Sequence, residues 1–371
     1  MSDGARVPKY IHIKQIIAER IRENGLIPGQ QVPSISELME RFNVSKVTAV
    51  RALAELEADG MVQRRHGSGT FVSDLKKKAS QVRVRPSVFI IVPDMANPFY
   101  SEVVGNIEKH IRDEGIAVEL AGTNYQTEVE HRLLSTIVSE GHVAGIVWIS
   151  VQGTHPSVEI PPDMPLVLVD HCPPELEGRC VSITCDNFTG GHFAAAHLAS
   201  LGHERVGYIN LPYGSLQRLE GFRRGFDESG VRLQEDWILT IDSAWQVETE
   251  VAGFVQRWNL TALAFVNDMI AMRAMKCLRS HGYNIPADIS LVGYDNVEAS
   301  RFLEIPLTTV EQYEDQIGRK TVECLIEGIR SKNHRLRPRE ILIVPNLVVR
   351  SSTAACKAPL MRENSLIPPP Y

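Results

Sequence analysis

The stretch VSKVTAVRALAELEADG, residues 44–60, has the pattern of a short amphipathic helix that begins at Ser45 and ends at Gly60. A serine in front of a helix caps it because the hydroxyl accepts a hydrogen bond from a free backbone N–H, and a glycine ends it because it tolerates the left-handed conformation. The inner side of this helix is predicted from apolar residues at helical spacing, which are Val50, Leu53 and Leu56.

Two further helices are predicted before this one. The first follows Pro8, which suits the first turn of a helix because its missing N–H needs no partner there. Apolar residues at helical spacing mark its buried side up to Asn24-Gly25: Tyr10, Ile13, Ile16, Ile17 and Ile21. The second begins with the capping box Ser34-Ile35-Ser36-Glu37, in which the Ser34 hydroxyl and the Glu37 carboxylate satisfy each other's backbone N–H groups.

A β-hairpin is predicted directly after the third helix, with strands at Met61–Arg65 and Thr70–Val72. Three helices with a tight connection at Asn43-Val44, followed by a hairpin, make a winged helix-turn-helix, an α+β fold. In this fold the third helix enters the DNA major groove by its N-terminal residues, and the hairpin tip reaches the backbone or the minor groove. The expected contacts are Ser45, Lys46, Val47, Thr48 and Arg51 on the helix, and Arg64, Arg65, His66, Gly67, Ser68 and Gly69 on the hairpin. The alternative is a helical hairpin with a solvated basic loop.

The charge of the chain is unevenly distributed. The whole chain carries a net charge of −6, with about +6 on residues 1–85 and about −12 on the remainder. A basic first segment on an acidic body indicates that the first segment meets a polyanion and the body does not.

Six short motifs over about residues 8–73 resemble the DNA-binding domain of the GntR family in order and spacing. They are Pro8-Lys9-Tyr10, Leu26-Ile27-Pro28-Gly29, Val32-Pro33-Ser34, Val44–Leu53, Leu56-Glu57-Ala58-Asp59-Gly60 and Gly67-Ser68-Gly69-Thr70-Phe71-Val72. The resemblance implies double-stranded operator DNA as a partner and adds Ser34 and Ser36 to the expected contacts. At three positions where the family frequently contacts DNA through arginine, this chain has Ser36, Lys46 and Val50, so we expect its operator to differ from the family's commonest half-site.

A polar, basic segment at residues 74–86 has no periodicity and is predicted to be a flexible or semi-extended linker. Its three lysines, Lys76, Lys77 and Lys78, either add non-specific attraction to phosphates or belong to a plain tether.

From Ser87 onward apolar runs alternate with amphipathic stretches. The runs are 88–92, 117–121, 144–149, 166–169, 181–184, 206–209, 238–241, 262–266 and 289–292, and the predicted helices are 99–114, 128–140, 188–201, 216–229, 248–258 and 268–281. Continuous apolar strands separated by helices predict parallel sheets covered on both faces, an α/β fold. The length indicates two lobes, and because ligands of open α/β sheets bind beyond the C-terminal ends of the strands, we expect a ligand site in a cleft between them.

This body resembles the LacI/GalR family sensor domain, which is built like periplasmic sugar-binding proteins, over about residues 87–354. The motifs are Val92–Tyr100, Asp186-Asn187 with Gly190-Gly191, Leu201-Gly202-His203, Arg218–Phe222, Asn267-Asp268, Ile289–Asn296, Pro306–Val310 and Leu347–Thr353. The resemblance implies one lobe at about 87–185 and 312–340, and another at about 186–311 and 341–354. A GntR-type head on such a sensor is the arrangement of AraR-like regulators.

The family pattern also implies a set of effector contacts. Arg218 matches a ligand-contacting arginine, whose guanidinium can hold vicinal hydroxyls or a carboxylate. Asn267 and Asp295 each follow a strand and offer hydrogen bonds to hydroxyl groups. Trp245 is expected as an aromatic wall for the apolar face of a sugar, and Asp94, Phe99 and Tyr100 as the lining from the other lobe. Each residue alone also fits a turn, a helix cap or an ion pair. Asp186 is expected to cap a helix at the crossing between lobes.

The sequence favours a regulator over an enzyme or a transport-type solute-binding protein. It has no HExxH, GxSxG or Walker motif, and we expect no metal and no cofactor. The N-terminus has no apolar run with a cleavage site, and no window of about 20 apolar residues occurs, so a signal peptide and a membrane span are not predicted. We expect a cytoplasmic homodimer. Its DNA binding is expected to be controlled by an effector that is a sugar, a nucleoside or a sugar acid, with sugars favoured.

Two smaller expectations concern the cysteines and the C-terminus. The six cysteines form no CxxC pair and are predicted to be reduced, mostly buried thiols. Residues 355–371 match nothing in either family and are predicted to be disordered.

Overall fold

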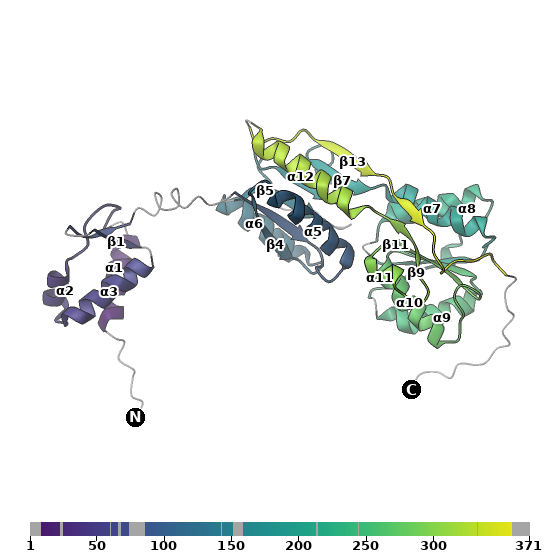
Figure 1. The fold of residues 1–371 in the computed structure, drawn as a ribbon, viewed down its shortest axis with the longest axis horizontal. Coiled ribbons are helices and arrows are strands. Elements are labelled where there is room, and N and C mark those ends of the chain that lie inside the picture. The colour runs from purple at the N-terminus through teal and green to yellow at the C-terminus, as the bar shows by residue number, and fades with distance from the viewer. Residues whose placement is uncertain are drawn as a thin grey trace, which may run out of the picture. The chain divides into compact units, whose positions relative to one another are not determined.

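The computed structural model describes residues 9–22, 25–59, 61–65, 68–73, 86–141, 143–150, 159–212, 214–243, 245–331 and 333–357. The chain divides into two compact units between Arg85 and Pro86 (Figure 1). Pro8, Asn24, Gly60, His66, Gly67 and most of the predicted linker and tail lie outside the described residues, and the expectations placed on them are not assessed.

The first unit contains three helices and a hairpin, as the sequence predicts. The helices are α1 (Lys9–Arg22), α2 (Ile35–Phe42) and α3 (Lys46–Ala58), and the antiparallel strands are β1 (Val62–Arg65) and β2 (Gly69–Val72). Both predicted helix caps are confirmed. The Ser34 hydroxyl accepts a hydrogen bond from the backbone N–H of Glu37, whose carboxylate accepts one from Ser34 N, and the Ser45 hydroxyl accepts one from Thr48 N.

The core of the first unit is small and mainly apolar. Leu38, Ala49 and Leu56 have no exposed surface, and they pack with Ile13, Ile17 and other residues of α1. The alanines of α3 matter here because a small side chain lets two helices approach each other closely. The opposite side of α3 is left free at the surface.

The second unit contains two six-stranded sheets, each covered on both faces by helices. The first sheet has the order β13-β7-β6-β5-β3-β4, with β3 (Ser87–Val92), β4 (Ala117–Gly122), β5 (Val143–Ile149), β6 (Leu166–Val169), β7 (Val181–Cys185) and β13 (Arg339–Ile343) all parallel. Alternation along β3 explains the two covered faces. Val88 and Ile90 pack with α5 (Pro98–Arg112) and α12 (Glu314–Arg330), whereas Ile91 packs with α6 (Thr127–Glu140).

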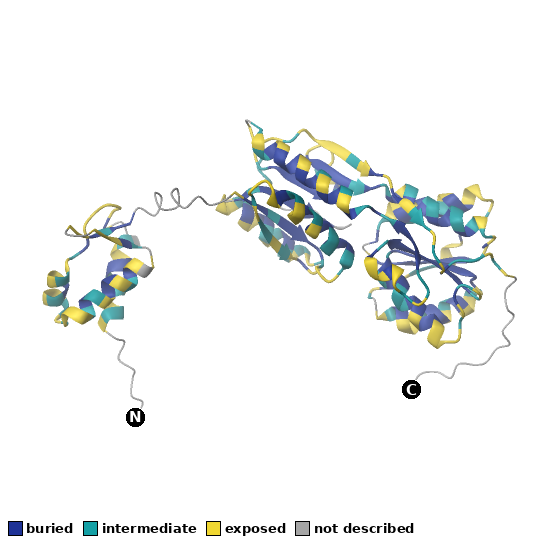
Figure 2. Ribbon diagram, viewed as in Figure 1, coloured by how far each residue is buried: buried dark blue, intermediate teal, exposed yellow. Residues whose placement is uncertain are grey.

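The second sheet has the order β14-β12-β11-β10-β8-β9. Its strands are β8 (Val206–Asn210), β9 (Ile238–Thr240), β10 (Ala262–Phe265), β11 (Ser290–Asp295), β12 (Thr308–Glu311) and β14 (Asn346–Val348), which is antiparallel to β12. One face packs on α7 (Asn187–Ser200) and α8 (Leu216–Glu228), and the other on α9 (Gln246–Trp258) and α10 (Asp268–Ser280). Figure 2 shows the sheets as buried layers beneath helices that are exposed on their outer sides. The remaining short elements are α11 (Glu298–Arg301), η1 (Pro174–Leu176) and η2 (Glu235–Trp237).

Three chain segments pass from one sheet to the other: Asp186 after β7, residues 312–313 after β12, and residues 344–345 after β13. The first and third lie together, because Asp186 N donates a hydrogen bond of 2.9 Å to Ile343 O. The predicted helix cap at Asp186 is confirmed, since its carboxylate accepts a hydrogen bond of 2.9 Å from Thr189 N.

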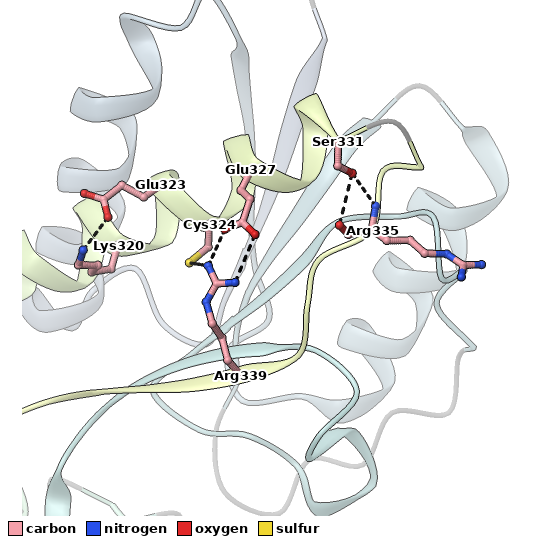
Figure 3. A network of polar contacts seen from close by, with 7 residues as sticks. All are labelled: Lys320, Glu323, Cys324, Glu327, Ser331, Arg335 and Arg339. Atoms are coloured by element: carbon pink, nitrogen blue, oxygen red, sulfur yellow. Dashed lines mark hydrogen bonds and ion pairs between the residues drawn. The ribbon is translucent and has the colours of Figure 1, made fainter.

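The return from α12 to β13 is fixed by a polar network. Arg339, the first residue of β13, donates hydrogen bonds to the Glu327 carboxylate and to Cys324 Sγ on α12 (Figure 3). The Ser331 hydroxyl bridges the backbone N–H and carbonyl of Arg335 and closes the turn. All six cysteines are free thiols, and four of them are buried.

Candidate functional site

A pocket opens in the second unit at the C-terminal ends of strands from both sheets. It is lined by Asn97, Phe99, Tyr100, Tyr125, Asp170, His171, Asn187, Leu211, Gly214, Ser215, Arg218, Val266, Asn267, Asp295 and Gln312. Its empty space, including the part of the mouth that is open to solvent, is about 650 Å³. Asp170 directly follows β6, Asn267 follows β10 by one residue, Asp295 ends β11 and Gln312 follows β12. The edge of the parallel sheets therefore supplies most of the polar groups.

Arg218 lies at the centre of the pocket and is buried, with 7% of its surface exposed. Its Nε and Nη2 donate hydrogen bonds of 3.0 and 2.7 Å to Asn187 Oδ1, and Nη1 donates one to Val266 O. The guanidinium stacks on the Tyr294 ring, 3.4 Å from its centre. A guanidinium carries five N–H donors, so this fixed group keeps donors for a ligand after its protein contacts are made.

Close packing of α7 against α8 holds Arg218 beside Asn187. A Cβ atom added to Gly191 would lie 2.0 Å from the Arg218 carbonyl oxygen, and one added to Gly221 would lie 1.9 Å from the Phe188 carbonyl oxygen. Only glycine permits these two helices to approach so closely. The Gly190-Gly191 and Arg218–Phe222 motifs in the sequence therefore lie on opposite sides of the contact between α7 and α8.

The carboxyl groups of Asp170, which is partly buried, and of Asp295, which is buried, flank the guanidinium. Burial raises the pKa of Asp170 and of Asp295, and Arg218 opposes the rise in both cases. Asp170 accepts a hydrogen bond of 3.4 Å from the Tyr100 hydroxyl, and Asp295 accepts one of 2.7 Å from Gln312 Nε2. Both aspartates have positive φ angles, 74° and 110°, a strained conformation that tends to be kept where a side chain must be aimed at a site.

Five of the seven sequence-predicted effector residues line this pocket: Phe99, Tyr100, Arg218, Asn267 and Asp295. The rings of Phe99 and Tyr100 are in an edge-to-face contact with centres 5.3 Å apart. Asn267 also caps α10, because its Oδ1 accepts a hydrogen bond of 2.9 Å from Ile270 N.

The structure does not bring Asp94 and Trp245 into the pocket lining. The Asp94 carboxylate accepts a hydrogen bond of 2.8 Å from Ala96 N and closes a turn. Trp245 is 71% exposed, and the guanidinium of Arg273 lies 5.1 Å from its ring centre. Trp245 immediately precedes α9, and this cation–π contact holds the ring at the surface.

Sequence reasoning missed Asp170, His171, Tyr125, Asn187 and Gln312. A usable signal existed for Asp170, because it directly follows the apolar run 166–169, as Asn267 and Asp295 follow theirs. Gln312 has one buried atom, Oε1, without a hydrogen-bond partner among the described residues. A buried polar atom of this kind is costly unless a water molecule or a ligand satisfies it.

The first unit presents a free face at the start of α3. Lys46, Val47 and Arg51 are exposed, and Val47 has 77% of its surface accessible. The Ser45 and Thr48 hydroxyls lie 2.9 Å apart and are hydrogen-bonded to each other. The guanidinium of Arg51 stacks on the Tyr10 ring at 4.1 Å. This face combines two cations, two hydroxyls and one methyl-bearing side chain, the groups that read base edges and phosphates.

The hairpin carries a second set of predicted contacts. Arg64 and Arg65 are exposed, and the Arg65 guanidinium lies 4.7 Å from the Phe71 ring centre. Gly69 has φ of 111°, and a Cβ atom there would lie 2.4 Å from Gln31 Nε2. On α2, Ser34 is committed to the capping box and Ser36 is exposed. The contacts predicted at His66 and Gly67 lie outside the described residues.

Two family models match the chain where these two units lie. Residues 9–72 match bacterial regulatory proteins of the gntR family, and residues 195–353 match the periplasmic binding protein-like domain. The chain thus belongs to the bacterial transcription regulators that join a GntR-family helix-turn-helix domain to a periplasmic-binding-protein-like domain. Relatives named transcriptional repressors, together with this domain composition, make the chain an effector-controlled regulator.

Similar proteins match either nearly the whole chain or its larger part. The chain is 29% identical over 370 residues to the arabinose metabolism transcriptional repressor of Geobacillus stearothermophilus, covering 94% of this chain and 98% of that one. It is 27% identical over 369 residues to the protein of that name in Halalkalibacterium halodurans, with the same coverage. The transcriptional regulator DegA of Bacillus subtilis is 30% identical over 276 residues, covering 72% and 80%.

The fold of the second unit is also found in solved structures. A LacI family transcriptional regulator from Enterococcus faecium, with bound ribose, is 23% identical and has a TM-score of 0.62 over 73% of this chain and 100% of that one. The transcription regulator CcpA of Lactococcus lactis is 18% identical with a TM-score of 0.61, over 72% and 99%. Among the described residues no helix is both long enough and apolar enough to cross a membrane.

Proposed function

We propose that this chain represses transcription by binding operator DNA through its first unit, and that a neutral sugar in the pocket of its second unit releases it. In this proposal residues 1–73 form the DNA-binding domain, 74–86 the linker, 87–354 the sensor and 355–371 a tail. The chain acts in the cytoplasm, catalyses no reaction and needs no cofactor. The full-length relatives named as repressors support this assignment.

The observation that carries the proposal is the set of groups around Arg218. One guanidinium, the carboxyl groups of Asp170 and Asp295, and the amides of Asn267 and Gln312 converge in a single pocket. Hydroxyl groups both donate and accept hydrogen bonds, so a polyol can pair with all of these groups at once. The aromatic rings of Phe99 and Tyr100 add a flat apolar wall, which suits the C–H face of a sugar.

The balance of charge favours a neutral ligand over an acid. An anionic effector would meet Arg218, but it would also be placed against the partly buried carboxyl group of Asp170 and the buried one of Asp295. Where they are ionised, these carboxyl groups repel an anion and oppose its attraction to Arg218. Among neutral sugars, arabinose is the first candidate because two full-length relatives are named for arabinose metabolism.

The DNA contacts proposed here are those on the free face of α3 and on the hairpin. Lys46, Thr48 and Arg51 would contact phosphates or base edges in the major groove, and Val47 would pack on thymine methyl groups. Arg64, Arg65 and the hairpin glycines would meet the backbone beside it. Ser34 and Ser36 would contribute hydroxyls at the start of α2.

In this proposal, the two-fold symmetry of a homodimer couples ligand binding in the second unit to DNA binding by the first. A homodimer would place two DNA-binding domains on the two halves of a palindromic operator. Ligand in the pocket would favour a closed arrangement of the two lobes over an open one, and it can shift that equilibrium only by its difference in affinity for the two. The closed arrangement would change the separation of the two heads and weaken their joint hold on DNA.

Fluorescence anisotropy with purified full-length protein and its own upstream DNA tests the proposal. We expect tight, salt-sensitive binding that L-arabinose or another neutral aldose reverses, and that the matching uronic acid does not. Static light scattering should show a dimer. Binding to DNA without release by any sugar of a neutral panel, or release by uronates alone, would contradict the sugar assignment. Turnover of the sugar in the same mixture would contradict the non-catalytic role.

A further inference from the structure

A strongly basic segment joins α12 to β13 in the otherwise acidic second unit. Residues 330–339 read RSKNHRLRPR and contain five arginine or lysine residues, one histidine and no acidic residue. We call this segment the basic turn; its Lys332 lies outside the described residues. Since the chain beyond residue 85 carries about −12 in total, such a run of cations is an exception within the unit.

The basic turn is held in place by one hydroxyl group and one apolar side chain. The Ser331 hydroxyl accepts a hydrogen bond of 2.9 Å from Arg335 N and donates one of 3.3 Å to Arg335 O. Leu336 packs on the core of the first sheet, where a Cβ atom added to Gly328 would lie 2.9 Å from Leu336 Cγ. Because these contacts fix the backbone around Arg335, the neighbouring side chains are presented from a defined position.

The two arginines at the ends of the basic turn are paired with carboxylates. Arg330 forms an ion pair with Glu114, and Arg339 forms one with Glu327 on α12. Successive side chains of a strand point to opposite faces, so Glu340 points away from α12, on whose side Arg339 lies. The acids that pair with the basic turn are thus engaged at its two ends.

The middle of the basic turn presents two arginines to solvent. Arg335 and Arg337 are exposed, and within the described part of the chain neither side chain forms a hydrogen bond or an ion pair. Figure 3 shows the Arg335 side chain extending from the turn in the direction away from α12. His334 is exposed beside them and has a left-handed φ of 51°. Two such guanidinium groups suit a ligand with repeated negative charges, because each can donate a pair of hydrogen bonds to a phosphate.

The basic turn lies at the edge of the first sheet where the chain enters the second unit. The strands of this sheet are parallel and begin at one edge: Ser87 of β3 pairs with Val143 of β5, and Val181 of β7 pairs with Arg339 of β13. Three strands separate β3 from β13, which at the usual strand spacing is roughly 19 Å. Residues 74–85 lead from the first unit to this edge and span at most about 40 Å when extended. DNA bound by the first unit is therefore kept near the edge that carries the basic turn.

We propose that the basic turn is a second DNA-contacting surface, which binds the phosphate backbone of the duplex that the first unit holds. The inference rests on the proposed function, because the first unit must bind DNA for the turn to meet it. A duplex carries one negative charge per about 1.7 Å of its axis, so it offers phosphates to Arg335 and Arg337 together. Such contacts add affinity and salt dependence but read no base sequence. The body, whose overall charge predicts that it avoids a polyanion, meets one at this edge.

Fluorescence anisotropy and hydroxyl-radical footprinting of the full-length protein on its own upstream DNA test this. The double variant Arg335→Ala/Arg337→Ala should bind roughly tenfold more weakly, and the slope of log affinity against log salt should fall by about 2. It should also lose protection at backbone positions that the parent protects. Arg335→Lys/Arg337→Lys keeps both charges and should retain most of the affinity. An unchanged melting temperature checks that each variant is folded.

The matched control removes two cations elsewhere in the same unit. Arg232 and Arg319 are exposed, and among the described residues neither forms an ion pair. Arg232→Ala/Arg319→Ala therefore changes the net charge by the same amount, and it should bind DNA as the parent does. Equal affinity, salt slope and footprint in Arg335→Ala/Arg337→Ala and in this control would overturn the inference. An equal loss of affinity in both would also overturn it, because net charge alone would then explain the effect.

Lys46→Ala, on α3, separates this inference from the proposed function. We expect Lys46→Ala and Arg335→Ala/Arg337→Ala each to weaken DNA binding, with losses that add when the changes are combined, because distant contacts act independently. If Lys46→Ala weakens binding and the double variant does not, the first unit binds DNA as proposed and the basic turn takes no part. If the parent binds no duplex at all, the proposed function fails and this inference fails with it.

Discussion

Asn187 holds Arg218 through a single oxygen atom, which accepts hydrogen bonds of 3.0 Å from Nε and 2.7 Å from Nη2. The two residues lie on adjacent helices, α7 and α8, and both line the pocket. Asn187 thereby fixes the plane of the guanidinium and leaves donors of Arg218 free. An arginine held in this way loses little side-chain freedom when a ligand binds.

Replacing Arg218 tests the centre of the pocket. Arg218→Ala should weaken sugar binding by more than about tenfold, because a charge-assisted hydrogen bond contributes about 1.5–3 kcal/mol. Isothermal titration calorimetry measures the loss. Arg223→Ala, on the same helix but paired with Glu235 at the surface, is the control and should bind as the parent does. Unchanged affinity in Arg218→Ala would remove this residue from the effector site.

Asn187→Ala tests positioning apart from contact. This variant keeps the Arg218 guanidinium but removes the oxygen atom that fixes its orientation. Sugar affinity should therefore fall by a smaller factor than in Arg218→Ala, roughly threefold to tenfold. Asn187→Asp keeps the accepting oxygen and should restore most of the affinity. A rescue that fails while thermal stability is preserved would show that Asn187 matters only through packing.

The free face of α3 gives a prediction about DNA. Lys46→Ala and Arg51→Ala should each weaken operator binding and lower the slope of log affinity against log salt by about 1 if the lost contact is to a phosphate. Sugar affinity should be unaffected, because both residues lie in the other unit. Arg20→Ala, an exposed cation on α1, is the matched control. If Lys46→Ala and Arg51→Ala bind DNA as Arg20→Ala does, the groove assignment is wrong.

Two helical glycines in the sensor form a matched pair. Gly221→Ala would place a Cβ atom 1.9 Å from the Phe188 carbonyl, whereas Gly253→Ala meets nothing within 4 Å. The first should lower the free energy of unfolding by about 1–3 kcal/mol or more, through overpacking between α7 and α8. The second should raise it by about 0.5–1 kcal/mol, as alanine does in a helix interior. Chemical denaturation of both variants measures this contrast, and equal effects would contradict the close approach.

Burial of His203 predicts a loss of stability in mild acid. Its ring nitrogens are engaged by Thr261 and Ser290 hydroxyls at 3.0 Å, and burial lowers its pKa from the ordinary value of 6.5. The folded protein therefore binds this proton less readily than the unfolded chain. The contribution is present above pH 6.5 and is lost as the pH falls through that value. Melting temperature should drop between pH 7.5 and 5.5, and His203→Gln should flatten the drop.

Much of the pocket could be predicted from the positions of strand ends and from the family pattern. The remaining residues depend on the direction of side chains, which the sequence does not give. Asn267 and Asp295 were predicted because they match the family's contact positions and each follows a strand, and parallel strands deliver their C-terminal residues to one edge. Arg218, on α8, was predicted from the family pattern alone. Asp170 obeys the same rule, since it directly follows β6, but it lies outside the family motifs from which the contacts were predicted. Gln312 follows β12, where a crossing between lobes, not a strand end alone, places the side chain.

Asp94 and Trp245, the two predicted residues outside the pocket lining, show what the sequence pattern does not predict. Trp245 lies in the loop region expected for an aromatic wall, but the nearby Arg273 provides a cation–π contact that keeps the ring outward. Asp94 is in a motif shared with the family, but its carboxylate is used by Ala96 N within a turn. Such contacts depend on rotamers and on neighbours from distant elements, which spacing along the chain does not encode. In the first unit, local rules sufficed because caps and turns are decided within four residues.

The three crossings between the sheets limit how the lobes can move. The hydrogen bond from Asp186 N to Ile343 O joins the first crossing to the strand that leads into the third, so these two crossings are held together. The second crossing contains Gln312, whose amide holds Asp295 inside the pocket. Gln312 therefore belongs both to a crossing between the lobes and to the pocket lining. A ligand that contacts Gln312 would act directly on the segment that joins the two lobes.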